Sequence, residues 1–271
     1  MSIRGLLRGL LVALSFGAAD ASAGEFVEIQ TGPATEPVRL IGYLARPPGA
    51  GPFSAVVLLH GCGGFHSSMI SWADRLSRFG YAALAVDSFG PRGIDQHCNY
   101  FPDQATDGFA ALRYLATRDF VRPSHVAVMG FSLGGGSALA VLEKGPLEQR
   151  HVEKFRAGIA FYPPCQYASG IMTGPTLVLT GGADDWALAS SCEAMVAGRT
   201  ELGAPRTPGD RSSVELVVYP GVHHGFDQLE LSIVPTRGVT FQSHRIEYNE
   251  DALKDSIVRV REFLQRTIAA P

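Results

Sequence analysis

Short apolar runs alternate with amphipathic stretches along most of the chain. The apolar runs have the length of buried strands and occupy 55–59, 125–129, 175–180 and 214–219. The stretches that suit helices occupy 68–79, 103–118, 135–143, 187–200 and 250–267. Ahead of them, 26–30 and 38–45 alternate as in an antiparallel edge hairpin. The pattern predicts an α/β fold with a mainly parallel central sheet and helices on both faces, which binds ligands at the carboxyl ends of its strands.

A candidate nucleophile follows the second of these apolar runs. The sequence Gly-Phe-Ser-Leu-Gly-Gly at 130–135 lies between a predicted strand and a predicted helix. This is the setting of a G-x-S-x-G elbow, in which glycines leave room for a strained turn that lifts the serine hydroxyl clear of the sheet. We therefore expect Ser132 to be the nucleophile, with the amide of Leu133 facing the oxyanion that its attack would create.

A serine nucleophile needs a base, and the base needs an orienting group. Asp184 and Asp185 follow the third apolar run, and His223 and His224 follow the fourth. Asp184 comes first after the Gly-rich turn and is expected to orient the base, whereas Asp185 is expected to cap the next helix. His224 is the predicted base, and its neighbour His223 is expected to point away. The order Ser, Asp, His at successive strand ends is the order of an α/β-hydrolase fold.

The remaining element of such a site lies upstream. The first apolar run leads into His-Gly-Cys-Gly-Gly at 60–64. Glycines allow a backbone amide to approach a substrate carbonyl, so the amide of Cys62 is the predicted second oxyanion donor. The alternative is an ordinary Gly-rich turn before a helix.

On these motifs, at 130–135, 182–184 and 224–226, the chain resembles the dienelactone hydrolase family of α/β-hydrolases. The best-known members of that family have a cysteine nucleophile tuned by a glutamate. Ser132 and Gly61 stand at those positions here. The resemblance therefore implies a hydrolase of esters or lactones with an ordinary serine triad and no cofactor.

The resemblance also implies a substrate contact. Members that accept dienelactone hold its carboxylate with two arginines, and Arg92 resembles the first. Asp227 and Gln228 stand where the second would fall. We therefore expect a carboxylate clamp with one cation, and a preference for neutral esters over dienelactone itself.

The ends and the composition of the chain bear on its compartment. Arg4 and Arg8, an apolar run and Ala-Ser-Ala at 21–23 predict a signal peptide over 1–23, which leaves a hydrolase domain over 24–271. The predicted location is periplasmic or secreted, without membrane association after cleavage. A net charge of -3 with 18% charged residues offers no basic patch for nucleic acid.

The four cysteines suit disulfides in an exported protein. The strands that lead to Cys165 and Cys192 should be neighbours, so that pair is the first expectation and Cys98 with Cys165 the second. No C-x-x-C spacing points to a metal site.

The sequence thus indicates an exported serine hydrolase that cleaves ester or lactone bonds of small molecules through an acyl-enzyme. Two alternatives remain open. One is a peptidase or acyltransferase with the same triad, and the other is an inactive hydrolase fold that serves in binding.

Overall fold

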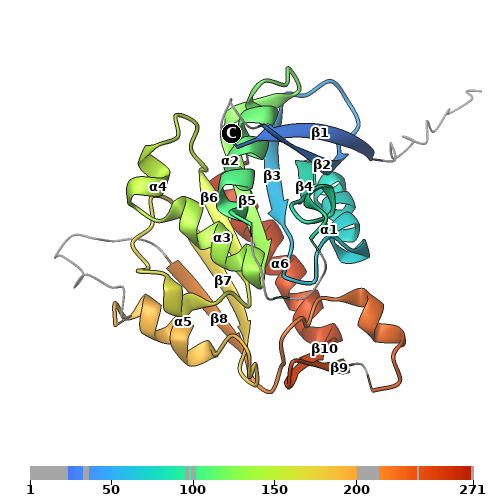
Figure 1. Cartoon of the computed structure of the whole chain (residues 1–271), viewed down its shortest axis with the longest axis vertical. Coiled ribbons are helices and arrows are strands. Elements are labelled where there is room, and N and C mark those ends of the chain that lie inside the picture. Colours follow the sequence, from blue (N-terminus) through green and yellow to red (C-terminus); the bar gives the residue numbers. More distant parts are fainter. Residues whose placement is uncertain are drawn as a thin grey trace, which may run out of the picture.

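The computed structural model describes residues 24–32, 37–94, 98, 102–199, 214–236 and 238–269. Its centre is an eight-stranded sheet with the order β1-β2-β4-β3-β5-β6-β7-β8, in which β1, β2 and β4 pair antiparallel and the other pairs are parallel (Figure 1). The strands are β1 (Glu25–Thr31), β2 (Val38–Ala45), β3 (Phe53–Leu59), β4 (Ala82–Asp87), β5 (Val121–Phe131), β6 (Ala157–Phe161), β7 (Thr176–Gly181) and β8 (Val214–Tyr219). The predicted α/β-hydrolase architecture with a mainly parallel sheet is confirmed.

Helices cover both faces of the sheet. The helices α2 (Gln104–Ala116), α3 (Leu133–Leu142) and α5 (Ala189–Val196) pack on one face, and α1 (Ser67–Arg78) and α6 (Glu250–Thr267) pack on the other (Figure 1). Successive side chains of a strand point to opposite faces, so Val57 and Leu59 of β3 join one core while Val56 and Leu58 join the other. Because both faces are buried, the central strands are continuous apolar runs rather than alternating ones.

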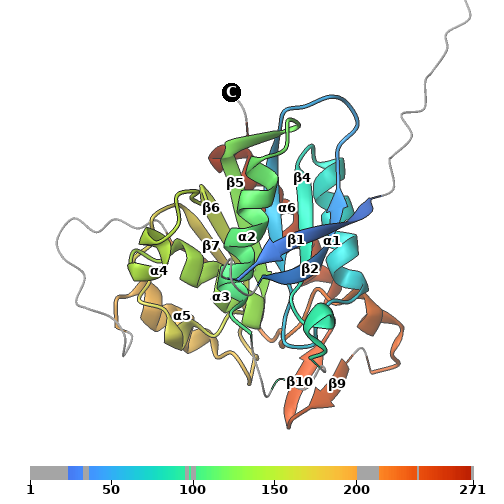
Figure 2. The ribbon, with the colours of Figure 1, turned by 45° about the horizontal axis from the view of Figure 1, so that its top comes forward.

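Short elements complete the chain. They are the helix α4 (Pro146–Gln149), the 3₁₀ segments η1 (Gly90–Arg92), η2 (Cys165–Tyr167) and η3 (Leu229–Ile233), and a separate hairpin of β9 (Gly238–Phe241) and β10 (His244–Glu247). The hairpin lies in the stretch between Gln228 and Tyr248. Figures 1 and 2 both place it beyond the end of the sheet to which the parallel strands point, where ligands bind in such folds.

Local sequence signals mark the helix boundaries. The side chain of Asn249 accepts a hydrogen bond from the amide of Ala252 at 2.9 Å, so it caps α6 as its residue type favours. Asp103 does the same for α2 through the amide of Thr106 at 3.0 Å.

The described helices include none long and apolar enough to cross a membrane. The predicted signal peptide, 1–23, lies outside the described residues.

Candidate active site

The backbone at Ser132 has φ of 52° and ψ of -114°, an unusual conformation for a residue with a side chain. The turn from β5 brings the start of α3 so close to the end of β3 that a Cβ on Gly134 would lie 2.2 Å from the carbonyl oxygen of Leu59. Only glycine fits that position. The amide of Ser132 donates to the carbonyl of Phe161 at 2.9 Å, which ties the turn to β6. The sequence therefore forms a strained elbow that holds the Ser132 hydroxyl at the end of the sheet.

Three side chains from three strand ends form one hydrogen-bonded chain. Nε2 of His224 lies 2.9 Å from Oγ of Ser132, and Nδ1 of His224 lies 2.8 Å from Oδ2 of Asp184. The side chains of His224 and Asp184 are 4% and 0% exposed. This is the arrangement in which a carboxylate orients an imidazole and the imidazole accepts a serine proton.

The two adjacent aspartates, Asp184 and Asp185, have different hydrogen-bond partners. Asp184 is fixed further because its Oδ1 accepts the amides of Trp186 and Ala187 at 2.9 and 2.8 Å. Asp185 instead accepts the amide of Arg245 at 3.1 Å, on β10. The expectation that Asp185 caps a helix is wrong, because α5 begins only at Ala189.

The histidine loop is supported from two sides. The carbonyl of His224 accepts the amide of Glu247 at 3.0 Å, so β10 holds the loop in place. The rings of Tyr162 and Trp186 lie 4.5 and 5.1 Å from the His224 ring, measured between centroids. His223 points elsewhere, with its Nε2 3.9 Å from a carboxylate oxygen of Glu247. The imidazole of His224 is thus confined between aromatic rings and a strand.

The peptide unit between Gly61 and Cys62 lies beside the nucleophile. A Cβ on Gly61 would be 3.3 Å from Cβ of Ser132, and Cys62 lines the cavity at the site. The carbonyl of Gly61 lies 2.7 Å from Nδ1 of His60 and accepts the amide of Gly64 at 3.1 Å. In a trans peptide the N–H points opposite to the C=O, so these bonds on Gly61 direct the amide of Cys62 away from His60.

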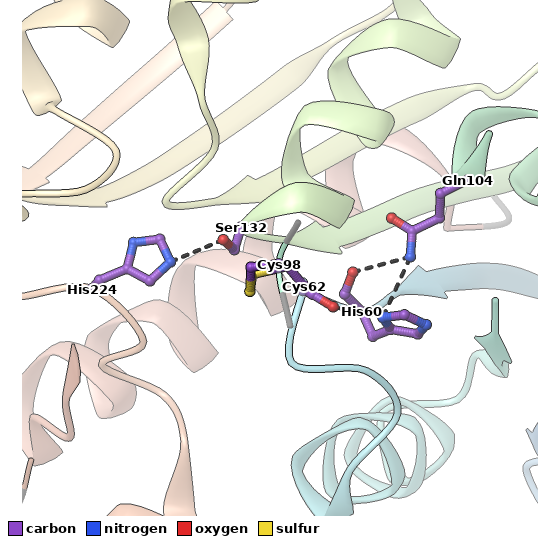
Figure 3. The surroundings of a disulfide bond; sticks show 7 residues. His60, Cys62, Cys98, Gln104, Ser132 and His224 are labelled. Atoms are coloured by element: carbon purple, nitrogen blue, oxygen red, sulfur yellow. Dashed lines mark hydrogen bonds between the residues drawn. A yellow bond between two sulfur atoms is a disulfide. The ribbon is translucent and has the colours of Figure 1, made fainter. Parts of the chain in front are cut away.

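The tautomer of His60 follows from its partners. The amide of Ser88 donates to Nε2 at 3.1 Å, so the proton is on Nδ1 and is donated to Gly61. Gln104 donates to the carbonyl of His60 at 3.1 Å (Figure 3). Burial lowers the pKa of His60 and favours the neutral ring that this network requires. The sequence alone did not single out His60 from the glycine motif. Its position directly after a buried strand was the signal that could have marked it as a residue of the site.

A cavity of about 310 Å³ opens over Ser132, His224 and Cys62. Its walls are mostly apolar and come from Met69, Trp72, Phe131, Tyr162, Trp186 and Phe241. The described residues that line it include no lysine and no arginine. Among the described parts of the chain, no three His, Cys, Asp or Glu side chains are grouped so that they could hold a metal ion.

The cavity contains one buried carboxylate, that of Asp227. Its Oδ2 accepts Nε1 of Trp72 at 2.8 Å and its Oδ1 accepts the Tyr162 hydroxyl at 2.5 Å. Burial raises the pKa of Asp227, and burial together with the charge of Asp227 raises the pKa of Tyr162 well above its ordinary value. These groups fix one wall of the cavity.

Arg92 does not join these residues. Its guanidinium binds both oxygens of Asp107 at 2.7 and 2.8 Å and the carbonyl of Ser88 at 2.8 Å. It is not among the residues that line the cavity. The physical reason is that the Asp107 side chain is 0% exposed, and a buried carboxylate without a cation would be strongly unfavourable. The structure thus gives Arg92 a partner within the fold where the sequence predicted a substrate contact.

The four cysteines form two disulfides. Cys165 pairs with Cys192, the first of the pairings expected from the sequence, because β6 and β7 are neighbours. Cys62 pairs with Cys98, a pairing that the sequence analysis did not consider. The second disulfide joins the loop beside Ser132 to the segment after η1.

The fold and this geometry define a hydrolase of the α/β class. The model of the dienelactone hydrolase family matches residues 40–268, and the chain belongs to that family. The probable 2-oxo-3-(5-oxofuran-2-ylidene)propanoate lactonase of a Bradyrhizobium species is 26% identical over 212 residues, which are 69% of this chain and 79% of that protein.

Solved structures agree with the assignment of the fold. Dienelactone hydrolase of Anabaena variabilis superposes with a TM-score of 0.64 at 19% identity, over 91% of this chain and 100% of that one. Esterase 2 of Thermogutta terrifontis, in the form phosphoramylated by tabun, superposes with a TM-score of 0.66 at 17% identity, over 93% and 98%. These structures support the fold, and the family match over residues 40–268 makes the chain a hydrolase of dienelactone hydrolase type.

The buried His60 makes stability depend on pH. Its pKa is lowered in the folded protein, so below about pH 6.5 the unfolded chain binds a proton that the folded chain does not. The free energy of unfolding is expected to fall as the pH drops below that value, despite the opposing charges of Asp87 and Asp107 nearby. Urea unfolding at several pH values measures how steeply the free energy of unfolding changes with pH. His60→Asn should flatten this dependence and His125→Asn should not; equal slopes in both variants would contradict this origin.

Proposed function

We propose that this protein cleaves ester or lactone bonds of small, neutral molecules through Ser132, His224 and Asp184. The observation that carries the proposal is the continuous hydrogen-bonded chain from Asp184 through His224 to Ser132, which ends in an apolar cavity. The family membership supports hydrolysis, and the Bradyrhizobium relative is named for a lactone substrate.

In the proposed reaction, His224 removes the Ser132 proton while the hydroxyl oxygen attacks the carbonyl carbon. The amides of Cys62 and Leu133 hold the oxyanion, and Leu133 is suited to this because the first amides of a helix lack partners within it. His224 then gives its proton to the leaving alcohol, and the acyl group stays on Ser132. His224 then takes a proton from water, whose oxygen attacks the acyl carbon. As the acid leaves, His224 returns a proton to the Ser132 oxygen.

The first test removes the triad residues one at a time. Ser132→Ala, Asp184→Asn and His224→Ala should each lower kcat/KM on p-nitrophenyl esters by about three orders of magnitude or more, because the three groups act as a unit. The matched variants Asp185→Asn and His223→Ala should lose less than about tenfold. Circular dichroism establishes that each variant is folded. Wild-type turnover in folded Ser132→Ala would refute the mechanism, and no Ser132-dependent turnover of any ester or lactone would favour a binding protein.

The second test concerns substrate charge. An anionic substrate would enter an apolar cavity that has Asp227 in its wall and no lysine or arginine among its described lining residues. His66, which also lines the cavity, is already paired with Glu230 at 2.7 Å, so the anion would lose hydration without gaining an unpaired cation. We expect kcat/KM for neutral short-chain esters and lactones to exceed that for a lactone carboxylate by about tenfold or more. Arg92→Ala should leave this ratio unchanged and lower stability instead, because it unpairs Asp107. A preference for the anionic lactone that disappears in Arg92→Ala would restore the two-arginine pattern of the family.

We further propose that the protein is exported and that its signal peptide is cleaved behind residue 23. Two disulfides favour an oxidising compartment. Expressed with its leader in a bacterium, the protein should be recovered from the periplasm with Gly24 as its first residue. The intact mass without reductant, after thiol alkylation, should show no modified cysteine. Recovery of the uncleaved chain in the cytoplasm would contradict export.

A further inference from the structure

The two disulfides occupy different surroundings. Cys165 and Cys192 are each 0% exposed and lie in the core between η2 and α5. Cys62 and Cys98 both line the cavity together with Ser132 and His224, and Figure 3 shows this disulfide in the surroundings of the nucleophile. One disulfide therefore belongs to the packing of the fold and the other to the candidate active site.

We propose that Cys98 is a positioning residue for the reaction. Through its disulfide it holds Cys62, and so places the amide that receives the oxyanion. The proposal rests on the function proposed above. It also implies that a dithiol reductant, by opening this bond, lowers turnover reversibly.

The loop around Cys62 is held by hydrogen bonds on the Gly61 carbonyl and by the disulfide of Cys62. Gly61, Gly63 and Gly64 flank Cys62 and contribute no side chains, so the backbone here is intrinsically free to adopt many conformations. Gly63 has open space where its Cβ would be. The carbonyl of Gly61 accepts hydrogen bonds from Nδ1 of His60 and from the amide of Gly64, and the second bond closes a turn around Cys62 that orients its peptide but leaves its Cα without a tether of its own. On the Cys62 side, the disulfide is the covalent anchor.

An oxyanion donor is sensitive to such anchoring. The amide must lie within hydrogen-bonding distance of the oxygen in the tetrahedral intermediate, and it contributes most when it needs no rearrangement during the reaction. A loop that samples other positions still admits substrate but stabilises the transition state less. Loss of the anchor should therefore lower kcat much more than it changes KM.

Opening the bond takes two electrons and two protons. One dithiol supplies both, forms its own cyclic disulfide, and leaves thiols on Cys62 and Cys98. Cys98 is only partly buried at the cavity wall, so the reductant can reach it. Cys165 and Cys192 are protected by their burial. Mild reduction should open the first bond and leave the second closed, which mass spectrometry after alkylation can establish.

The decisive measurement compares oxidised, selectively reduced and reoxidised wild-type enzyme. Reduction should lower kcat on a neutral p-nitrophenyl ester by about ten- to a hundredfold, with KM changed less than about threefold, since complete removal of an oxyanion donor costs 10²–10³. Reoxidation should restore kcat. A trifluoromethyl ketone, which forms a tetrahedral adduct with a serine nucleophile, should bind more weakly in proportion to the loss of kcat.

Two cysteine variants form a matched pair. Cys98→Ser should reproduce the reduced state and no longer respond to dithiol. Cys192→Ser removes the core disulfide, so it should lower the free energy of unfolding while it keeps kcat and the response to dithiol. If Cys98→Ser does not fold, the comparison of reduced and reoxidised wild type decides the question.

The outcomes separate the two proposals. Ser132-dependent turnover that is unchanged when Cys62 and Cys98 are demonstrably alkylated would overturn the positioning role and leave the proposed function intact. A rise in KM without a loss of kcat would also overturn it, because the disulfide would then only shape the cavity. Absence of Ser132-dependent turnover in the oxidised enzyme would remove the proposed function, and the positioning role with it.

Discussion

The candidate site depends on one close approach of two backbone segments. The start of α3 lies against the end of β3, where a side chain at Gly134 would meet the carbonyl of Leu59 at 2.2 Å. This contact brings the Ser132 turn next to the loop of Gly61 and Cys62. The strands β3 and β5 are paired neighbours, with Leu59 opposite Gly130, and the approach of α3 sets how closely the hydroxyl and the amide expected to receive the oxyanion lie. The strain at Ser132 is maintained because this packing and the bond to Phe161 leave the turn no alternative.

The parallel sheet provides the remaining groups by geometry alone. Strands β5, β7 and β8 all end at the same edge, so residues that follow them are brought together although they are far apart in sequence. Hydrogen bonds between these loops then set their spacing. The amide of Ala183 donates to the carbonyl of Val222 at 2.9 Å, which ties the loop of Asp184 to the loop of His224. The order of the strands thus fixes which groups meet, and the loop contacts fix the distances.

The sequence indicated which residues would meet where a single strand and its end carried the signal. Ser132, Asp184 and His224 were placed because each follows a long apolar run, and their hydrogen bonds join the same three residues. The apolar runs recognised in the sequence do not include β4 and β6. These two strands are rich in alanine, which has little preference for strands and gives a weaker pattern.

The features that the sequence did not predict depend on contacts between residues of different segments, which only the folded chain brings together. The pairing of Arg92 requires Asp107, a residue of α2 that only the folded arrangement brings beside η1. The disulfide of Cys62 depends on the path of a loop that no strand pairing determines, whereas Cys165 and Cys192 follow neighbouring strands. Asp227, which stands where the second arginine of the family would fall, lies buried in the cavity wall, where Trp72 and Tyr162 donate hydrogen bonds to it. A resemblance to a family cannot supply such contacts where this chain has different residues.

Gly61, at the position that resembles the family's glutamate, accords with the proposal that Ser132 is the nucleophile. A thiol can be activated as a thiolate by shifts in its surroundings, but a serine hydroxyl has to lose its proton to a base during attack. A side chain at position 61 would begin 3.3 Å from Cβ of Ser132, close enough for a carboxylate there to compete with His224 for the hydroxyl. With glycine at this position, Nε2 of His224 is free to be the acceptor of the Ser132 proton. The glycine also lets the Gly61 peptide lie close to Ser132, so both the proposed base and the proposed oxyanion donor depend on this one residue.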